Sequence, residues 1–282
     1  MSSPNANVSW FGRIILGAGF LFLYLPIILL VVFSFNESRL SSSWSGFSFK
    51  WYGELMNDDS MLKAAWVSLK IAFTSATAAV VLGTLASLVM TRFKFFRGKT
   101  LFGALITAPL VMPEVVTGLS LLLMFVTLFA PFGISPKGML SIWIAHVTFT
   151  MAFVTVIISS RLAELDKSLE EAAMDLGANR LKIFFVITLP IIFPALISGW
   201  LLAFTLSLDD VVISSFVAGP DSTTLPMKIF STVRLGLNPK INALASIIVA
   251  VVSTTALVAW AISHREEKRR QRDIQLALQK GD

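Results

Sequence analysis

The chain has 282 residues, of which 55% are hydrophobic and 14% are charged, and its mean hydropathy is +0.78. This composition is too apolar for an ordinary soluble domain and indicates an integral membrane protein. Cysteine is absent, and the two histidines, His146 and His264, form no cluster with ligand spacing, which excludes disulfides and thiolate chemistry and predicts no metal site.

Six apolar runs, each near or above the roughly 20 residues that cross a bilayer, predict an all-α membrane protein with six transmembrane helices. The predicted spans lie at about residues 14–35, 62–91, 101–130, 139–159, 184–216 and 241–263. We interpret residues 1–282 as a single transmembrane domain. The first run lacks a small-residue cleavage site after it, so we expect a retained anchor rather than a secretory signal.

The formal net charge is +6, and its distribution predicts the orientation of the chain. Lys and Arg concentrate in the connections that are internal when the N-terminus is internal, so both termini are predicted to be cytoplasmic. The basic tail after Ser263 lies directly beside a span, which favours contact with lipid headgroups over binding of nucleic acid.

Two external segments are long enough to form a lid or a docking rim, residues 36–61 and 218–240. The first contains Trp51. The second contains an apolar-periodic stretch from Met227 to Leu235, which predicts a short surface helix.

Three acids, Glu114, Asp209 and Asp210, lie within apolar runs. An ionisable group inside a bilayer costs at least about 2.5 kcal/mol unless it is paired or solvated, so these acids are functional candidates. At 1.5 Å per residue, Glu114 lies roughly 20 Å along the third span and Asp209 about 27 Å along the fifth, both in the outer half. Pro109 and Pro113 free backbone carbonyls near Glu114 and are expected to loosen that helix beside a cavity.

Asp209 and Asp210 are about 100° apart on a helix, so we expect one on a solute pathway and the other serving a neighbouring helix. Ser207 shares a helix face with Asp210. An ion pair with Lys70 is the structural alternative for one acid, and it still leaves at least one acid unpaired. A flexible diamine fits such separated carboxylates, and Trp51 would add a cation–π attraction of about 0.5–2 kcal/mol, unless it is an ordinary interfacial tryptophan.

The cytoplasmic connection, residues 160–183, contains a short polar helix. Ser168 and Glu171 fit a capping box at its start, and Gly177 fits a left-handed stop at its end. The small pair Ala172 and Ala173 allows close approach of a partner surface. A helix that only covers the ends of neighbouring spans is the alternative interpretation.

The run Glu171-Ala172-Ala173-Met174-Asp175-Leu176-Gly177, followed by Ile187-Thr188-Leu189-Pro190, resembles the EAA loop of ABC-importer permeases. The resemblance implies a type I ABC-importer permease fold in which Glu171, Ala172, Ala173 and Gly177 couple the permease to a cytoplasmic ATPase. This chain has no Walker-type phosphate loop, so ATP and Mg are expected on the partner ATPase. The chain itself is predicted to be a transport subunit without a cofactor or catalytic residues.

Further motifs resemble the second, shorter permease of bacterial putrescine and spermidine importers. They are Lys50-Trp51-Tyr52, Pro113-Glu114, Ser159-Ser160-Arg161-Leu162 and the run from Gly199 to Asp210. The resemblance covers nearly the whole chain and implies that the substrate pathway contains Trp51, Glu114, Ser207, Asp209 and Asp210. Relatives often have Asp in place of Glu114, a difference that bears on the length of the preferred diamine.

The same resemblance implies a location in the bacterial inner membrane and a set of partners. These are a homologous second permease, two ATPase subunits and a periplasmic polyamine-binding protein. Putrescine is the favoured cargo, with spermidine or another small organic cation as the alternative.

Three other classes of membrane protein fit the sequence less well. An ion-coupled secondary transporter is expected to show inverted repeats, which the sequence lacks. A cation channel needs only rings of acids in a symmetric oligomer. A membrane enzyme needs a nucleophile, base and metal constellation that the polar residues of the spans do not supply. None of these classes accounts for the run from Glu171 to Gly177.

Overall fold

The computed structural model describes residues 10–39, 43–93, 95–166, 168–236, 238–254 and 257, without the side chains of Ala130 and Leu235. Its labelled elements are α1 (Trp10–Phe33), α2 (Lys50–Met56), α3 (Asp59–Arg92), α4 (Lys99–Val111), α5 (Glu114–Phe129), the 3₁₀ turn η1 (Ala130–Phe132), α6 (Met139–Glu164), α7 (Ser168–Asp175), α8 (Arg180–Ile183), the π-helix η2 (Phe184–Thr188), α9 (Leu189–Asp209), α10 (Val212–Val217) and α11 (Leu225–Leu235). A further helix covers Pro239–Thr254. The basic tail after Ser263 lies outside the described residues.

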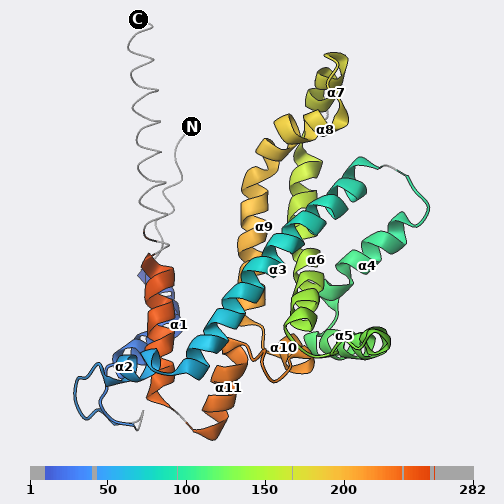
Figure 1. Cartoon of the computed structure of the whole chain (residues 1–282). Coiled ribbons are helices and arrows are strands. Elements are labelled where there is room, and N and C mark those ends of the chain that lie inside the picture. The colour runs from blue at the N-terminus through green and yellow to red at the C-terminus, as the bar shows by residue number, and fades with distance from the viewer. Residues whose placement is uncertain are drawn as a thin grey trace, which may run out of the picture. The chain divides into compact units, whose positions relative to one another are not determined.

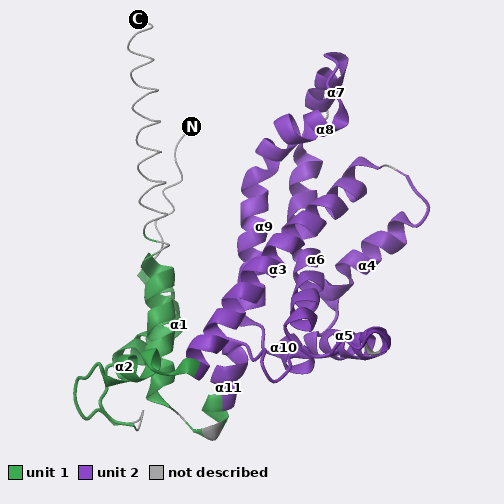
Figure 2. Ribbon diagram, viewed as in Figure 1, with its two compact units in different colours: residues 1–59, 232–282 green, residues 60–231 purple. Residues whose placement is uncertain are grey.

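The chain forms two compact units, residues 1–59 with 232–282 and residues 60–231 (Figure 2). In the first unit, an aromatic group of Phe35, Phe47, Phe49 and Tyr52 packs after the end of α1. The side chains of α1 are mostly exposed, as expected for a helix that faces lipid.

The second unit is organised around the packing of α6 against α9, with α4 and α10 also packed on α6 and α10 packed on α5. Small residues let α3 approach α6 closely. A Cβ added to Gly83 of α3 would lie 2.8 Å from the Val154 Cγ1 of α6. Figure 1 shows α7 and α8 at one end of the α6–α9 pair and α5 and α10 at the other.

Four described helices are long and apolar enough to span a membrane: α1, α3, α6 and the continuous run Arg180–Asp209. A fifth candidate is the pair α4 and α5, which is bent by 119°. The expectation of a single continuous helix over residues 101–130 is therefore wrong, although the two prolines correctly indicated a disturbance there. The predicted fifth helix, residues 184–216, is also interrupted, because α9 ends at Asp209 and α10 begins at Val212. The predicted surface helix near residues 227–235 is confirmed as α11.

Candidate functional site

Glu114 lies at the first break, as the first residue of α5. Met112 has an extended backbone, with φ −77° and ψ 138°, and the Pro113 carbonyl accepts hydrogen bonds from the amides of Val116 and Thr117 at 3.0 and 3.1 Å. Proline supplies no amide to continue α4, so the chain turns here and starts a new helix. Glu114 is exposed, and the positive end of the α5 dipole stabilises its carboxylate.

Asp209 and Asp210 lie at the second break. Asp209 ends α9, and Asp210 adopts an extended conformation with φ −65° and ψ 126°. The carboxylate of Asp210 then starts α10, because Oδ1 accepts from the Ile213 amide at 3.1 Å and Oδ2 from the Ser214 amide at 2.7 Å. The two acids are thus not neighbours on one continuous helix, and the helical spacing expected for them is wrong.

His146 of α6 connects the residues around this break. Its Nδ1 lies 2.6 Å from the Ser207 Oγ, and its Nε2 lies 3.2 Å from the Asp210 Oδ2 and 3.1 Å from the Ser214 Oγ. Ser207 Oγ also lies 3.0 Å from the Ser75 Oγ of α3. An ionised carboxylate only accepts hydrogen bonds, so His146 donates from Nε2 in its contact with Asp210. We call these five side chains the His146 network.

The predicted site residues near the two breaks fall into a buried group, which belongs to the His146 network, and an exposed group. Ser207 and Asp210 are 5% and 9% exposed, and their polar atoms are already hydrogen-bonded within the protein. Glu114 and Asp209 are exposed, and neither carboxylate has an ion pair within the described part of the chain. Asp209 also stands at the C-terminus of α9, where free carbonyls and the negative end of the dipole favour a cation.

Sequence reasoning missed His146 because it was assessed only as a metal ligand. Its position inside an apolar run was the available signal, since a polar side chain at membrane depth needs a partner. Among the described residues, no group of three or more His, Asp or Glu side chains is placed to hold a metal.

Lys70 and Trp51 have different surroundings from those expected. Lys70 is exposed and forms no ion pair with a described residue. Trp51 is only 2% exposed, and its Nε1 donates a 2.6 Å hydrogen bond to the Asn36 carbonyl. It belongs to the first unit, where it helps line a cavity of about 500 Å³ with Glu54 and Lys240. Its role with a cationic substrate stays a prediction.

The short helix α7 is capped differently at its two ends. Its first residue is Ser168, and the Asp166 carboxylate accepts from the Ser168 amide at 2.9 Å, which lowers the pKa of Asp166. The expectation that Ser168 is itself the cap is therefore wrong. At the other end, Gly177 has φ +82°, and the Gly177 and Ala178 amides donate to the Met174 and Ala173 carbonyls at 2.9 and 3.0 Å. This is the predicted left-handed stop.

Three large apolar side chains are exposed on α7 and on the residue that directly follows it. Leu169, Met174 and Leu176 are 47%, 45% and 90% exposed, and Glu171 and Ala172 are also exposed. Exposed apolar side chains on a helix outside the spans are typical of a surface that contacts another protein.

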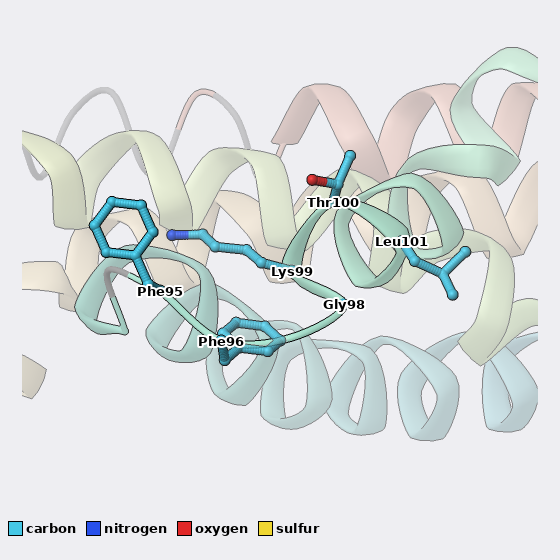
Figure 3. Close-up of a pocket in the computed structure, with 6 residues that line it drawn as sticks. All are labelled: Phe95, Phe96, Gly98, Lys99, Thr100 and Leu101. Atoms are coloured by element: carbon cyan, nitrogen blue, oxygen red, sulfur yellow. The ribbon is translucent and has the colours of Figure 1, made fainter.

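A second cavity lies in the connection between α3 and α4 (Figure 3). Its volume is about 540 Å³, and its lining includes Phe95, Phe96 and Lys99. Figure 3 shows the Lys99 side chain extending toward Phe95. None of its lining residues is acidic, so this cavity does not suit a cationic solute.

Comparison with known proteins gives consistent results. Residues 79–270 match the profile of the family described as "Binding-protein-dependent transport system inner membrane component". The chain is 60% identical, over 94% of both sequences, to the putrescine transport system permease protein PotI of Escherichia coli K12. It is 42% identical to the spermidine/putrescine transport system permease protein PotC of the same strain, over 93% of this chain and 99% of that one.

Solved structures with low sequence identity share the fold. One is a bacterial ABC transporter involved in the import of the acidic polysaccharide alginate, with a TM-score of 0.67, 16% identity and coverage of 93% of this chain and 98% of that one. Another is the MetNI methionine ABC transporter, with a TM-score of 0.57, 13% identity and coverage of 71% and 92%.

Proposed function

The chain belongs to the family of binding-protein-dependent transport system inner membrane components, and we propose that it moves polyamines, chiefly putrescine, from periplasm to cytoplasm by alternating access. It is a multi-pass permease subunit of an ABC importer and not itself an ATPase. The proposal extends this assignment to the cargo, to a type I fold with six spans and cytoplasmic termini, and to the residues that contact the cargo.

The observation that carries the proposal is the exposed carboxylate of Asp209 at the C-terminal end of α9, which forms no ion pair with any residue that the structure describes. An ammonium group there would gain from the carboxylate, from the free carbonyls of the last turn and from the helix dipole. Glu114, also exposed at a helix break, supplies a second carboxylate for the other end of a diamine. Discontinuous helices of this kind commonly form the substrate sites of transporters.

The buried acid has a different role in this proposal. Asp210 already accepts from two amides and faces His146, so it holds the break in shape rather than binding the cargo directly. Ser207 is also buried and lies within hydrogen-bond distance of His146, which supports the same role for it.

The partners in this proposal are a second permease, two ATPase subunits and a periplasmic binding protein. One of the ATPase subunits contacts the exposed surface of α7. The printed names of the relatives support the cargo. The relative that is 60% identical is a putrescine permease, and the one that is 42% identical serves spermidine and putrescine. Spermidine is therefore the second candidate.

The test is uptake by the complete complex in proteoliposomes. We expect ATP-dependent uptake of radiolabelled putrescine, with weaker competition from spermidine. Glu114→Gln and Asp209→Asn should lower uptake, because each removes a charge that pairs with an ammonium group. Glu164→Gln, which changes an exposed acid at the end of α6, is the control for loss of a charge. Unchanged uptake in both site variants would place the pathway elsewhere, and uptake without ATP would refute the ABC mechanism.

A further inference from the structure

Glu170 turns inward from α7, whereas its neighbour Glu171 is exposed. The Oε1 of Glu170 accepts a hydrogen bond from the Arg92 Nη2 at 2.6 Å and another from the Thr188 Oγ1 at 2.9 Å. One oxygen atom thus joins the coupling helix to the last residue of α3 and to the last residue of η2. We call Arg92, Glu170 and Thr188 the Glu170 joint.

The Glu170 joint is stronger than an ordinary surface ion pair. The side chains of Arg92 and Glu170 are 19% and 18% exposed, and Thr188 is 2% exposed. Charge-assisted hydrogen bonds that are shielded from water are shorter and stronger than neutral ones. The positions of the charges add to this, because Arg92 lies in the last turn of α3 and Glu170 in the first turn of α7, where the helix dipoles favour them.

A nearby pair shows the contrast. Arg161 and Glu164, at the end of α6, also form an ion pair, at 3.0 Å, but their side chains are 46% and 65% exposed. Exposed pairs of this kind contribute little to stability or rigidity. They therefore offer a matched control for the Glu170 joint.

The Glu170 joint connects α7 to the two membrane helices α3 and α9, so a motion of α7 could be transmitted to them through it. Thr188 is followed directly by α9, which runs to Asp209, and Arg92 ends α3, whose Ser75 belongs to the His146 network. The segment between α8 and α9 is a π-helix, Phe184–Thr188. Such turns are rare and occur frequently at functional sites.

We propose that Glu170 is the positioning residue through which displacement of the coupling helix reaches α3 and α9. The proposal rests on the proposed function in one respect, namely that an ATPase moves α7. The two adjacent acids then have different roles. Glu171 lies on the exposed surface that the ATPase contacts, and Glu170 transmits the displacement of α7 to α3 and α9.

The test uses the complete complex in proteoliposomes, with two readouts: putrescine taken up per ATP hydrolysed, and stimulation of ATP hydrolysis by the binding protein. Glu170→Ala should lower the first ratio about fivefold, a typical coupling between distant sites, and should weaken the stimulation, while ATP hydrolysis continues. Thr188→Val, which replaces the hydroxyl with a methyl group, should partly lower both the uptake per ATP and the stimulation of ATP hydrolysis. Thr188→Ser keeps a hydroxyl and should restore both quantities. Glu164→Ala is the control for loss of an ion pair.

The outcomes separate this inference from the proposed function. The role of Glu170 would be refuted if Glu170→Ala and Thr188→Val took up as much putrescine per ATP as the wild type. An equal loss in Glu164→Ala would also refute it. If Glu170→Ala fails to assemble, the comparison of Thr188→Val with Thr188→Ser decides. If the wild-type complex takes up no putrescine, the cargo assignment fails, and the stimulation of ATP hydrolysis still tests the Glu170 joint because it does not require that cargo to be transported.

Discussion

Replacing Asp210 and Asp209 one at a time should separate stability from transport. Asp210→Ala removes the cap of α10, which typically costs about 1 kcal/mol. It also leaves the buried Nε2 of His146 without its carboxylate partner, and losing a buried hydrogen bond to a charged group costs about 1.5–3 kcal/mol. Together these losses predict destabilisation by about 2.5–4 kcal/mol. Asp209→Ala removes an exposed carboxylate and should leave the stability nearly unchanged.

Thermal unfolding of the detergent-purified complex measures the first effect, and uptake in proteoliposomes measures the second. We expect Asp210→Ala to lower both the unfolding temperature and the maximal uptake rate. Asp209→Ala should keep the unfolding temperature and raise the putrescine concentration needed for half-maximal uptake. Asp210→Asn is an intermediate variant, because its amide oxygen still accepts from one backbone amide.

The reverse pattern would refute this division of roles. If Asp209→Ala unfolds the complex while Asp210→Ala only weakens substrate binding, Asp210 faces the pathway and the His146 network does not hold the break. Equal destabilisation by the two variants would also contradict it, since among the described residues the Asp210 carboxylate is hydrogen-bonded to α6 and α10 and the Asp209 carboxylate is not.

Three further predictions concern other parts of the permease. Gly118→Leu should destabilise the complex by about 1–3 kcal/mol in thermal unfolding, because a Cβ there would lie 2.7 Å from the Phe216 ring; an unchanged unfolding temperature would contradict the packing of α5 on α10. Gly177→Val should lower uptake without preventing membrane insertion, because a β-branched residue is strained at φ +82° and the stop of α7 would be distorted; normal uptake would remove its coupling role. Glu171→Lys should weaken co-purification of the ATPase, because it reverses a charge on the exposed surface of α7, and full recovery of the ATPase would show that this surface is not the contact.

The sequence was sufficient to predict the helical membrane class, the polar helix α7 and the left-handed conformation of Gly177. These features depend on local patterns: hydropathy over about 20 residues, and a glycine after an amphipathic turn. The positive φ of Gly177 could be predicted because it depends only on this residue and on the hydrogen bonds of its immediate neighbours.

The breaks at Met112 and Asp210 could not be placed in the same way. Hydropathy does not distinguish a straight helix from two helices bent by 119°, because it depends only on the composition of the segment. The conformation of Asp210 depends on His146, which is 64 residues away in the sequence. Glu170 is a similar case, because its inward direction depends on Arg92 and Thr188, which only the folded chain brings together.

The length of α9 sets the scale of the motion that these contacts can transmit. The helix has 21 residues and is about 30 Å long, with the Glu170 joint immediately before its first residue and Asp209 as its last. A rotation of about 10° at its base would move Asp209 by about 5 Å if the helix stays straight. Pro194 lies inside α9, near its base, where it removes a backbone hydrogen bond and permits bending. The segment from Ala195 to Asp209 contains no proline, and α9 packs on α6, so this segment would move as one body. The bend at Pro194 would then set how much of a displacement at the Glu170 joint reaches the exposed carboxylate.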